Sequence, residues 1–288
     1  RFALYLGHPI MMDTLVTLPT NSIIHQSYKS KEREEPLNGD GFGVAWYVPS
    51  LVRKPAVFRS VSPAWSNQNL YHIARVTQSP CILAHVRAAS PGLPVIETNC
   101  HPFVIGDFAF MHNGYIPEFR RLKRRILREI SDDIYESIQG STDSEHIFAL
   151  FQEHLKKQTH QDITDAMIAA MRLTIQSILQ ILDEGKIEEP TQLNLAVTNG
   201  ESAVVTRFST GPSEKTNSLY VHMGKRFVCE DGICRMVEPK KFGDAVLIAS
   251  EKLSEGDDWE RVPHNHMVMV SLDDDEATML PCLVDESV

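Results

Sequence analysis

The sequence of 288 residues predicts an α+β fold in which antiparallel sheets are covered by helices. Segments with the pattern of short strands fill most of residues 1–110, helical patterns fill 117–183, and strand patterns return from 193 onward. Strands and helices are therefore grouped along the chain and do not alternate regularly. This grouping favours antiparallel pairing, with the helices packed outside the sheets.

The first group of strands is indicated by short apolar runs that end at turn residues. One of these runs, FGVAWYV, follows the turn at Asn38-Gly39. The expected strands are RFALYL (1–6), FGVAWYV (42–48), AVFRSV (56–61), CILAHVRAAS (81–90) and FVIGDFAFM (103–111).

Helices are expected in the middle of the chain. In residues 141–157, Thr142 stands three residues before Glu145, which is the spacing of a capping box at a helix start. Two other helices, over 117–130 and 162–183, are indicated by apolar residues that recur on one side. The recurring residues are Phe119, Leu122, Ile126 and Ile130 in the first, and Ile163, Met167, Ala170, Met171, Ile178 and Leu182 in the second.

After the helices, residues 193–208 predict a hairpin whose turn is Asn199-Gly200. Further strands are expected at SLYVHMG (218–224), DAVLIAS (244–250) and HMVMVSL (266–272). No break in composition marks a second domain. We therefore expect a single domain over residues 1–272 and a short acidic tail over 273–288.

Charge and composition exclude several classes of protein. The formal charge of −10 argues against general affinity for nucleic acid or an anionic membrane. No apolar run approaches the roughly 18 residues of a membrane span, and His8, Pro9 and Asp13 interrupt a stretch that superficially resembles a signal peptide. Five cysteines are an odd count in a long chain, so we expect no disulfide framework and a cytoplasmic location.

Two patterns have both a plain and a functional interpretation. Gly39, Gly41 and Gly43 precede a strand instead of a helix, so a nucleotide-binding loop is not expected. The plain interpretation is a hairpin turn; the functional one is the wall of a pocket, since glycine lets backbone approach a ligand closely. A basic run is expected to be a solvated helix face, with contact to a partner or nucleic acid as the alternative. Its residues are Arg120, Arg121, Lys123, Arg124, Arg125 and Arg128.

A metal site is not expected. Structural zinc sites use tight ligand pairs, and Cys229 and Cys234 have no matching second pair. The remaining candidates are loosely spaced, and the histidines among them are expected to be ordinary residues that are hydrogen-bonded at strand ends. These candidates are His85, Cys100, His101 and His112.

Other residues indicate chemistry rather than scaffolding. Arg87, in AHVRAAS, ends a strand, where a guanidinium can hold a carboxylate with two parallel hydrogen bonds. Asn113 and Gly114, in MHNGYI, offer a carboxamide and a backbone N–H, which together can hold a developing oxyanion. Asp143, in GSTDSE, can accept from an ammonium group or can cap a helix. Together they would recognise the two charged ends of an amino acid and activate a carbonyl further along it.

The order of these motifs resembles that of the class II glutamine amidotransferases, whose N-terminal-nucleophile hydrolase domain uses an N-terminal cysteine. The resemblance covers nearly the whole chain. It is closest to stand-alone members: bacterial putative amidotransferases, the γ-glutamyl hydrolase of the ergothioneine pathway and the glutathione-degrading amidotransferase subunit of yeasts. The motifs are, in order, RFALYLG, IIHQSY, NGDGFGVAWY, AHVRAASPG, NCHPF, MHNGYI, GSTDSE and IASEKL.

The resemblance implies a four-layer αββα sandwich of two antiparallel sheets between helical layers. It also implies roles for individual residues. Arg87 is expected to hold the α-carboxylate of the substrate and Asp143 its α-amino group. Asn113 and Gly114 are expected to form the oxyanion hole, and Ser90 to line the glutamine pocket. No cofactor is implied.

The nucleophile is the point where this sequence departs from the family pattern. In the family, the catalytic cysteine is the first residue of the mature protein and directly precedes an arginine equivalent to Arg1. The sequence begins at Arg1, so the nucleophilic cysteine is expected immediately before it. Cys100 lacks a free α-amine and is not assigned this role.

Three functions are compatible with the resemblance. The first is a stand-alone amidohydrolase that releases glutamate from glutamine or a γ-glutamyl compound. The second is a glutaminase subunit that works with a separate synthase or peptidase subunit. The third is an inactive relative that lacks the nucleophile and binds a γ-glutamyl ligand. Activity of the isolated chain separates the first two, and the identity of the true N-terminal residue decides the third.

Overall fold

The computed structural model describes residues 1–288 apart from 33–36, 90–91, 231–232, 239–244, 273–276 and 285–288. Its α-helices are α1 (Asp13–Val16), α2 (Ile23–Tyr28), α3 (Gln68–Ala74), α4 (Phe119–Ile126), α5 (Asp132–Tyr135), α6 (Asp143–Lys156) and α7 (Ile163–Glu184). Its strands are β1 (Phe2–Met11), β2 (Phe42–Val48), β3 (Val52–Ser60), β4 (Gln78–Val86), β5 (Phe103–Ile105), β6 (Phe108–Tyr115), β7 (Gln192–Thr198), β8 (Ser202–Arg207), β9 (Tyr220–Gly224), β10 (Arg226–Glu230), β11 (Ile233–Val237), β12 (Ala245–Ala249), β13 (Glu260–Arg261), β14 (His266–Ser271) and β15 (Thr278–Pro281).

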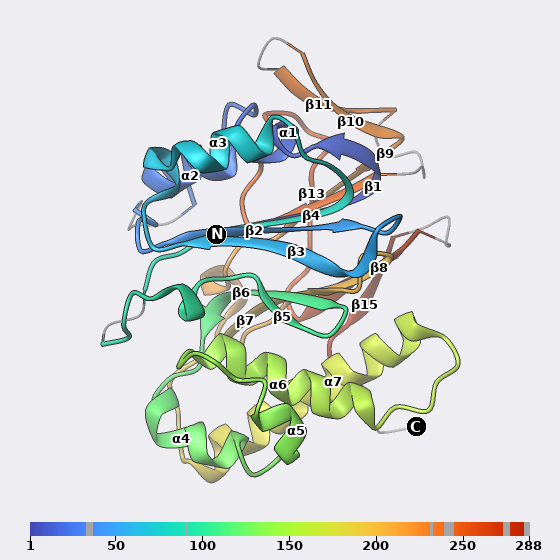
Figure 1. Ribbon diagram of the computed structural model, residues 1–288. Coiled ribbons are helices and arrows are strands. Elements are labelled where there is room, and N and C mark those ends of the chain that lie inside the picture. Colours follow the sequence, from blue (N-terminus) through green and yellow to red (C-terminus); the bar gives the residue numbers. More distant parts are fainter. Residues whose placement is uncertain (33–36, 90–91, 231–232, 239–244, 273–276, 285–288) are drawn as a thin grey trace.

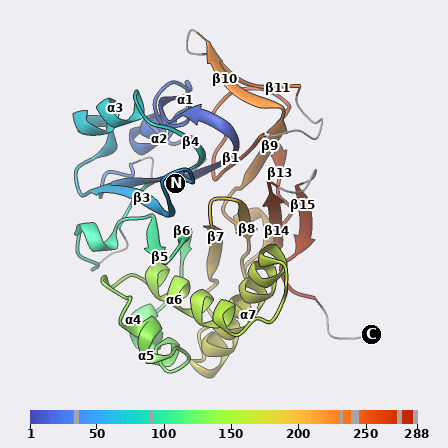
Figure 2. The ribbon, with the colours of Figure 1, turned by 45° about the vertical axis from the view of Figure 1, so that its right-hand side comes forward.

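The strands form two stacked antiparallel sheets. One has the order β13-β9-β12-β1-β4-β2-β3, the other has the order β15-β14-β8-β7-β6-β5, and β10 and β11 form a separate hairpin. In Figure 1, α1–α3 lie outside the first sheet and α4–α7 lie outside the second, and the view in Figure 2 agrees. The expected αββα layering of an α+β fold is confirmed.

β1 shows why the central strands have continuous apolar sequences. Alternate side chains of a strand point to opposite faces of its sheet. Phe2, Leu4 and Leu6 belong to the core between the two sheets. Ala3 and Tyr5 belong to the core between the first sheet and its helices. Both faces of β1 are therefore buried over residues 2–6, and the start of the strand lies inside the sandwich.

The main differences from the predicted elements involve short segments. Residues 103–111, expected as one strand, form the hairpin β5–β6, in which Gly106 has a φ of 59° that suits glycine. The helices α1, α2 and α3 were not predicted, because 4, 6 and 7 residues are too few for a clear helical period. Within the expected acidic tail, β15 pairs with β14 and extends the second sheet.

α7 matches the helix expected over 162–183. Its N-cap is Asp162, whose side chain accepts hydrogen bonds from the N–H groups of Thr164 (2.7 Å) and Asp165 (3.0 Å). By length and composition α7 is apolar enough to cross a membrane, yet 56% of its most apolar window is buried inside the protein. The residues expected on its buried side are buried except Ile163, which lies at its first turn.

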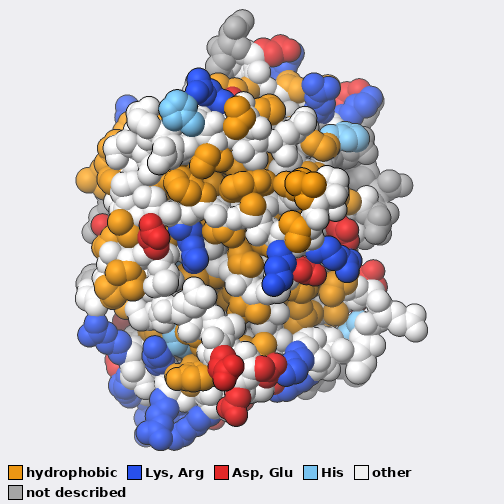
Figure 3. All heavy atoms as spheres, in the orientation of Figure 1, with side chains coloured by type: hydrophobic (Ala, Val, Ile, Leu, Met, Phe, Trp, Pro, Cys, Tyr) orange, Lys and Arg blue, Asp and Glu red, His pale blue; other side chains and the backbone are white. Residues whose placement is uncertain are grey.

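The basic run of α4 is mostly a solvated face, as predicted. Figure 3 shows Lys and Arg side chains gathered at the lower end of the molecule, over α4. Arg121 is paired with Glu118, and Arg125 with Glu184 at 2.9 Å, between half-exposed side chains. Such exposed pairs contribute little to stability.

The cysteines are mostly free. The described residues contain a disulfide between Cys229 and Cys234, which face each other across the β10–β11 hairpin. It is a local link between neighbouring strands. Cys81, Cys100 and Cys282 are free and buried.

Candidate active site

The start of β1, the ends of β4 and β6, and the first turn of α6 meet at one cavity of about 60 Å³. The cavity contains four of the five site residues predicted from the sequence. The fifth, Ser90, lies outside the described residues. The lining residues are Arg1, Asn38, His85, Val86, Arg87, Ala88, Leu93, His101, His112, Asn113, Gly114, Thr142, Asp143 and Ser144.

Arg87 directly follows β4 and is buried. Its backbone N–H donates to Gly41 O (2.9 Å) and its backbone O accepts from Asp40 N–H (3.0 Å), so the glycine-rich loop holds it in place. In the part of the chain that the structure describes, no carboxylate oxygen lies within 4 Å of its guanidinium. Burial lowers the pKa of Arg87, an effect that Cys100, Asp40 and Asp143 oppose. A ligand carboxylate would supply the missing charge partner.

The glycine-rich loop is shaped by close packing. A Cβ on Gly41, where φ is 109°, would lie 2.6 Å from Cys100 Sγ, and a Cβ on Gly43 would lie 2.2 Å from His101 O. These glycines therefore let the start of β2 press against the 100–101 segment, and Asn38 from the same loop lines the cavity. The interpretation as a pocket wall is supported, whereas the hairpin-turn interpretation is wrong, because the element that precedes β2 in the described structure is the helix α2.

Asp143 is the first residue of α6 but does not cap it. The cap is Thr142, whose Oγ1 accepts from Glu145 N–H at 3.2 Å. The Oδ2 atom of Asp143 accepts from Ile116 N–H (2.8 Å), and its Oδ1 atom accepts from Ser144 N–H (2.8 Å). The capping interpretation of Asp143 is thus wrong. Its carboxylate ties α6 to the end of β6 and retains lone pairs toward the cavity.

Asn113 and Gly114 lie where β6 runs beyond β5. The Nδ2 atom of Asn113 is buried and has no hydrogen-bond partner within the described structure. A Cβ on Gly114 would lie 1.9 Å from Gln192 O and 2.6 Å from His112 Nε2, so only glycine fits there. An unused donor at this depth is unusual, because buried polar groups are nearly always paired.

Histidines form one wall of the cavity. The rings of His85 and His101 stack with centroids 4.1 Å apart, and His85 Nε2 is hydrogen-bonded to His112 O at 3.0 Å. His112 is satisfied by Ser144 Oγ and Gln192 O, each at 3.0 Å. The expectation of ordinary, hydrogen-bonded histidines holds for His112 but not for His101, neither of whose ring nitrogens has a partner in the described part of the chain. The described residues contain no group of three or more His, Cys, Asp or Glu side chains arranged for a metal ion.

Stability should fall as the pH is lowered below about 6.5, because these histidines are buried in the neutral form. Burial lowers the pKa of His85 and His101 well below the usual value and also lowers the pKa of His112. At a pH between the unfolded and the folded pKa values, the unfolded chain binds more protons than the folded one. Each such histidine therefore lowers the free energy of unfolding by up to about 1.4 kcal/mol for each unit by which the pH falls. Urea unfolding at pH 7.5, 6.5 and 5.5 measures the slope of the free energy of unfolding against pH.

The slope should be smaller in His101→Phe and unchanged in His160→Gln, since His160 is exposed. Equal slopes in wild type and His101→Phe would show that His101 does not contribute to the loss of stability in acid.

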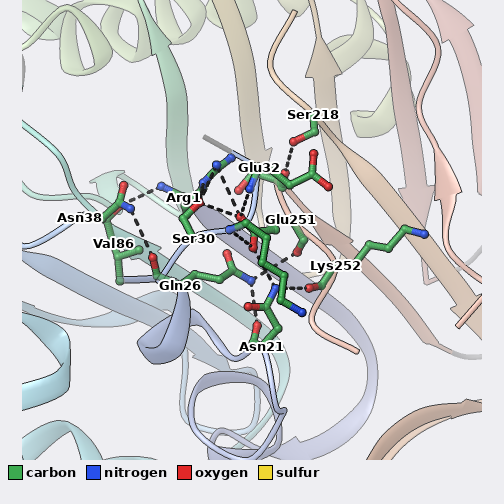
Figure 4. A network of polar contacts seen from close by, with 12 residues as sticks. Arg1, Asn21, Gln26, Ser30, Glu32, Asn38, Val86, Ser218, Glu251 and Lys252 are labelled. Carbon is green, nitrogen blue, oxygen red and sulfur yellow. Dashed lines mark hydrogen bonds and ion pairs between the residues drawn. The ribbon is translucent and has the colours of Figure 1, made fainter. Parts of the chain in front are cut away.

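Arg1 is held at the cavity by a buried ion-pair network (Figure 4). Its guanidinium lies 3.5 Å from Glu251 Oε2 and donates to Ser30 Oγ at 2.8 Å. Burial would raise the pKa of Glu251, but hydrogen bonds from Asn21 and the Lys31 N–H, with the charge of Arg1, lower it. The backbone N of Arg1 donates to Val86 O at 2.8 Å, next to Arg87. Glu251 lies in the IASEKL motif, which was a sequence signal for this network.

Cys100 stays outside the site. It is fully buried, does not line the cavity, and its Sγ lies 3.7 Å from Ser60 O and 3.6 Å from Ile96 O. Burial raises the pKa of its thiol, although Arg87 and Arg59 oppose this. A buried neutral thiol is a poor nucleophile.

Several known proteins are similar to this chain. A family model described as "Glutamine amidotransferases class-II" matches residues 12–281. The probable glutamine amidotransferase DUG3 of Saccharomyces cerevisiae is 39% identical over 306 residues, covering 99% of this chain and 85% of that protein. The gamma-glutamyl-hercynylcysteine sulfoxide hydrolase of Mycolicibacterium smegmatis is 24% identical over 271 residues, covering 94% and 95%.

Solved structures share the fold. A glutamine aminotransferase class-II domain protein from Silicibacter pomeroyi has a TM-score of 0.64 and 23% identity, covering 97% of this chain and 98% of that one. The glutamine phosphoribosylpyrophosphate amidotransferase of B. subtilis has a TM-score of 0.60 and 14% identity, covering 98% of this chain and 49% of that one. The family model spans most of the chain, and the yeast relative aligns over nearly all of it. The chain therefore belongs to the class II glutamine amidotransferases.

Proposed function

We propose that the protein hydrolyses the γ-amide of glutamine or of a γ-glutamyl compound, through a cysteine that directly precedes Arg1. The observation that carries this proposal is the position of the Arg1 backbone nitrogen, 2.8 Å from Val86 O at the wall of the cavity. A residue joined to that nitrogen would stand beside Arg87, Asn113 and Asp143, which line the same cavity.

The chemistry follows from a free α-amine beside a thiol. An α-amine has a pKa of about 7.7 to 8.0, so near neutral pH it can take the thiol proton. The thiolate then attacks the γ-carbonyl carbon, and the oxygen becomes an oxyanion held by Asn113 Nδ2 and Gly114 N–H. The C–N bond breaks as the α-ammonium returns the proton to the leaving amine. Water, deprotonated by the α-amine, attacks the thioester, and glutamate and the thiol are released.

The α-carboxylate and α-ammonium groups, which form the head of the substrate, would be bound by oppositely charged side chains. Arg87, with no carboxylate partner in the described structure, would hold the α-carboxylate with two parallel hydrogen bonds. Asp143, fixed by Ile116 and Ser144, would accept from the α-ammonium group. Binding in this form selects the glutamyl head and leaves the identity of the leaving amine open.

We favour hydrolysis by the chain alone over donation of ammonia to a partner. The relative from Mycolicibacterium smegmatis is named a hydrolase and aligns over 94% of this chain. The yeast relative, named a probable glutamine amidotransferase, supports the alternative, in which ammonia or glutamate release depends on a second subunit. Release of glutamate by the isolated chain separates the two.

Asp143→Ala should lower kcat/KM for γ-glutamyl amides by about 10- to 150-fold, because a hydrogen bond to a charged group contributes roughly 1.5 to 3 kcal/mol. The measurement compares glutamine with its analogue that lacks the α-amino group, on wild type and on the variant. Wild type should release glutamate readily and discriminate strongly against the analogue, whereas the variant should treat the two alike.

The matched control is Asp165→Ala, which removes an exposed carboxylate from the first turn of α7. It should keep the wild-type preference. No glutamate release by wild type would refute hydrolysis by the isolated chain, and equal discrimination by wild type and Asp143→Ala would refute the role of Asp143.

A further inference from the structure

We propose that Asn217 is a positioning residue for the oxyanion hole, an inference that rests on the function proposed above. The segment between β8 and β9 passes behind the end of β6, and there the Nδ2 atom of Asn217 donates to the backbone O of Asn113 at 3.2 Å. That oxygen belongs to the same peptide group as the Gly114 N–H. Asn217 therefore contacts the carbonyl oxygen of the peptide group whose N–H would stabilise the oxyanion.

The orientation of this peptide group follows from the contacts of its neighbours along β6. His112 O accepts from His85 Nε2 at 3.0 Å, so it points to the edge of β6 that faces the cavity wall. In a strand, the backbone groups of every second residue point to the same edge, so the Gly114 N–H points there too. Because a trans peptide is planar, its C=O points the opposite way, toward Asn217.

Asn217 is itself held at both ends of its backbone. Its N–H donates to Gln192 Oε1 at 3.1 Å. Its C=O accepts from Arg207 Nε at 3.0 Å and from Asn194 Nδ2 at 3.4 Å. The side chain therefore leaves a fixed point, and replacing it does not release the backbone.

Arg207 holds the segment between β8 and β9 in place. Its side chain is buried, and within the described structure its hydrogen bonds go to backbone carbonyls and to no carboxylate. The carbonyls are those of Asn217, Val262, Ser213 and Thr216. A guanidinium loses hydration when it is buried, so this arrangement suits an anchor whose purpose is to fix the course of the loop.

Asn217 should act on the transition state and little on substrate binding. A hydrogen bond to a peptide C=O polarises the group and strengthens its N–H as a donor. It also fixes the plane of the peptide, and an oxyanion donor is effective only when it is aimed at the position of the charged oxygen. Within the described structure, Arg87 and Asp143, which would bind the substrate head, make no hydrogen bond to Asn217.

The test uses the chain with its N-terminal cysteine and two substitutions at one position. Asn217→Ala should lower kcat for glutamine by up to about tenfold with KM nearly unchanged, the loss of one neutral hydrogen bond. Asn217→Asp keeps the shape of the side chain but places a carboxylate oxygen against Asn113 O, so it should lose more activity than Asn217→Ala. The inhibition constant of the γ-aldehyde analogue of glutamate, whose thiol adduct is tetrahedral, should rise by the same factor as kcat falls.

Thr216→Val is the control on the same loop. Thr216 Oγ1 is hydrogen-bonded with His264 Nδ1 at 2.9 Å and donates to Pro212 O at 3.3 Å, and in the described structure it makes no hydrogen bond to β6. This variant should keep the wild-type kcat and aldehyde affinity. If Asn217→Ala does not fold, as judged by circular dichroism, the kcat and aldehyde affinity of Asn217→Asp are compared with those of wild type to test the role of Asn217.

Full activity of Asn217→Asp, a loss confined to KM, or an equal loss in Thr216→Val would each overturn the role of Asn217. These results require an active wild type and so leave the proposed function standing. An inactive wild type that also fails to bind the aldehyde would overturn the proposed function and this inference together.

Discussion

Replacing the cysteine that we propose directly before Arg1 by alanine should lower kcat for glutamine on the order of 10⁴- to 10⁶-fold, as in other enzymes that lose their nucleophile. The other groups at the cavity, Arg87 and Asp143, would remain in place, so binding of glutamine should persist. Release of glutamate from glutamine measures the rate, and calorimetric titration with glutamine measures the binding.

A diazoketone analogue of glutamine should provide the matching covalent evidence. It should label the N-terminal residue of the active protein, as read from the mass of the N-terminal peptide, and the label should disappear in the alanine variant. Cys100→Ala is the control, because Cys100 is buried and does not line the cavity. Labelling at Cys100, or at no cysteine, would exclude the proposed nucleophile.

Asn113→Ala should lower kcat by about 100- to 1000-fold with little change in KM, the usual cost of losing one oxyanion donor. The structural reason is that Asn113 Nδ2 is buried without a partner in the described part of the chain. This donor is therefore available to a ligand, and it forms no hydrogen bond that stabilises the described structure on its own. Because a buried unpaired polar group is destabilising, the variant should unfold at the same temperature as wild type or higher.

Asn67→Ala should behave in the opposite way. Asn67 caps α3, with its Oδ1 accepting from Leu70 N–H at 3.0 Å, far from the cavity lining. Loss of such a cap typically costs about 1 kcal/mol of stability, and kcat should not change. If Asn113→Ala lost stability and changed only KM, Asn113 would be a structural turn residue and the oxyanion would be bound elsewhere.

Most of the site was accessible from the sequence because its residues lie in short motifs. Arg87, Asn113, Gly114 and Asp143 each stand out as polar residues or glycines beside apolar segments, and the structure brings them to one cavity. Their individual roles remain proposals. The role of Asp143 as a helix cap, suggested by local spacing alone, was wrong, because Thr142 occupies that position.

The contacts that support the site could not be read from local pattern. Asn217 reaches Asn113 over a sequence separation of 104, and Glu251 reaches Ser30 over 221. Neither pair has a characteristic spacing, because strand order and not sequence distance brings the residues together. The stacking of His85 on His101 is hidden for the same reason.

The fold was predicted best where segments were long. α6 and α7 and the β7–β8 hairpin follow from period and turn residues over many positions. The short helices α1–α3 and the two-residue strand β13 were missed. Their conformation is decided by packing on the first sheet, and a few residues carry too little intrinsic preference to reveal it.

The place of β1 in the middle of its sheet has a consequence for biosynthesis. Ala3 pairs both with Ala84 of β4 and with Ala249 of β12, and Phe2 N–H donates to Ser250 Oγ at 3.0 Å, so β1 gains one neighbouring strand early in synthesis and the other only after residue 250 has been made. Pairing over such a separation closes late in folding. Until then, Arg1 lacks the Glu251 with which it forms its buried ion pair. Under the proposed function, amidase activity would begin only after residue 251 has been made, and shorter nascent chains would not consume glutamine.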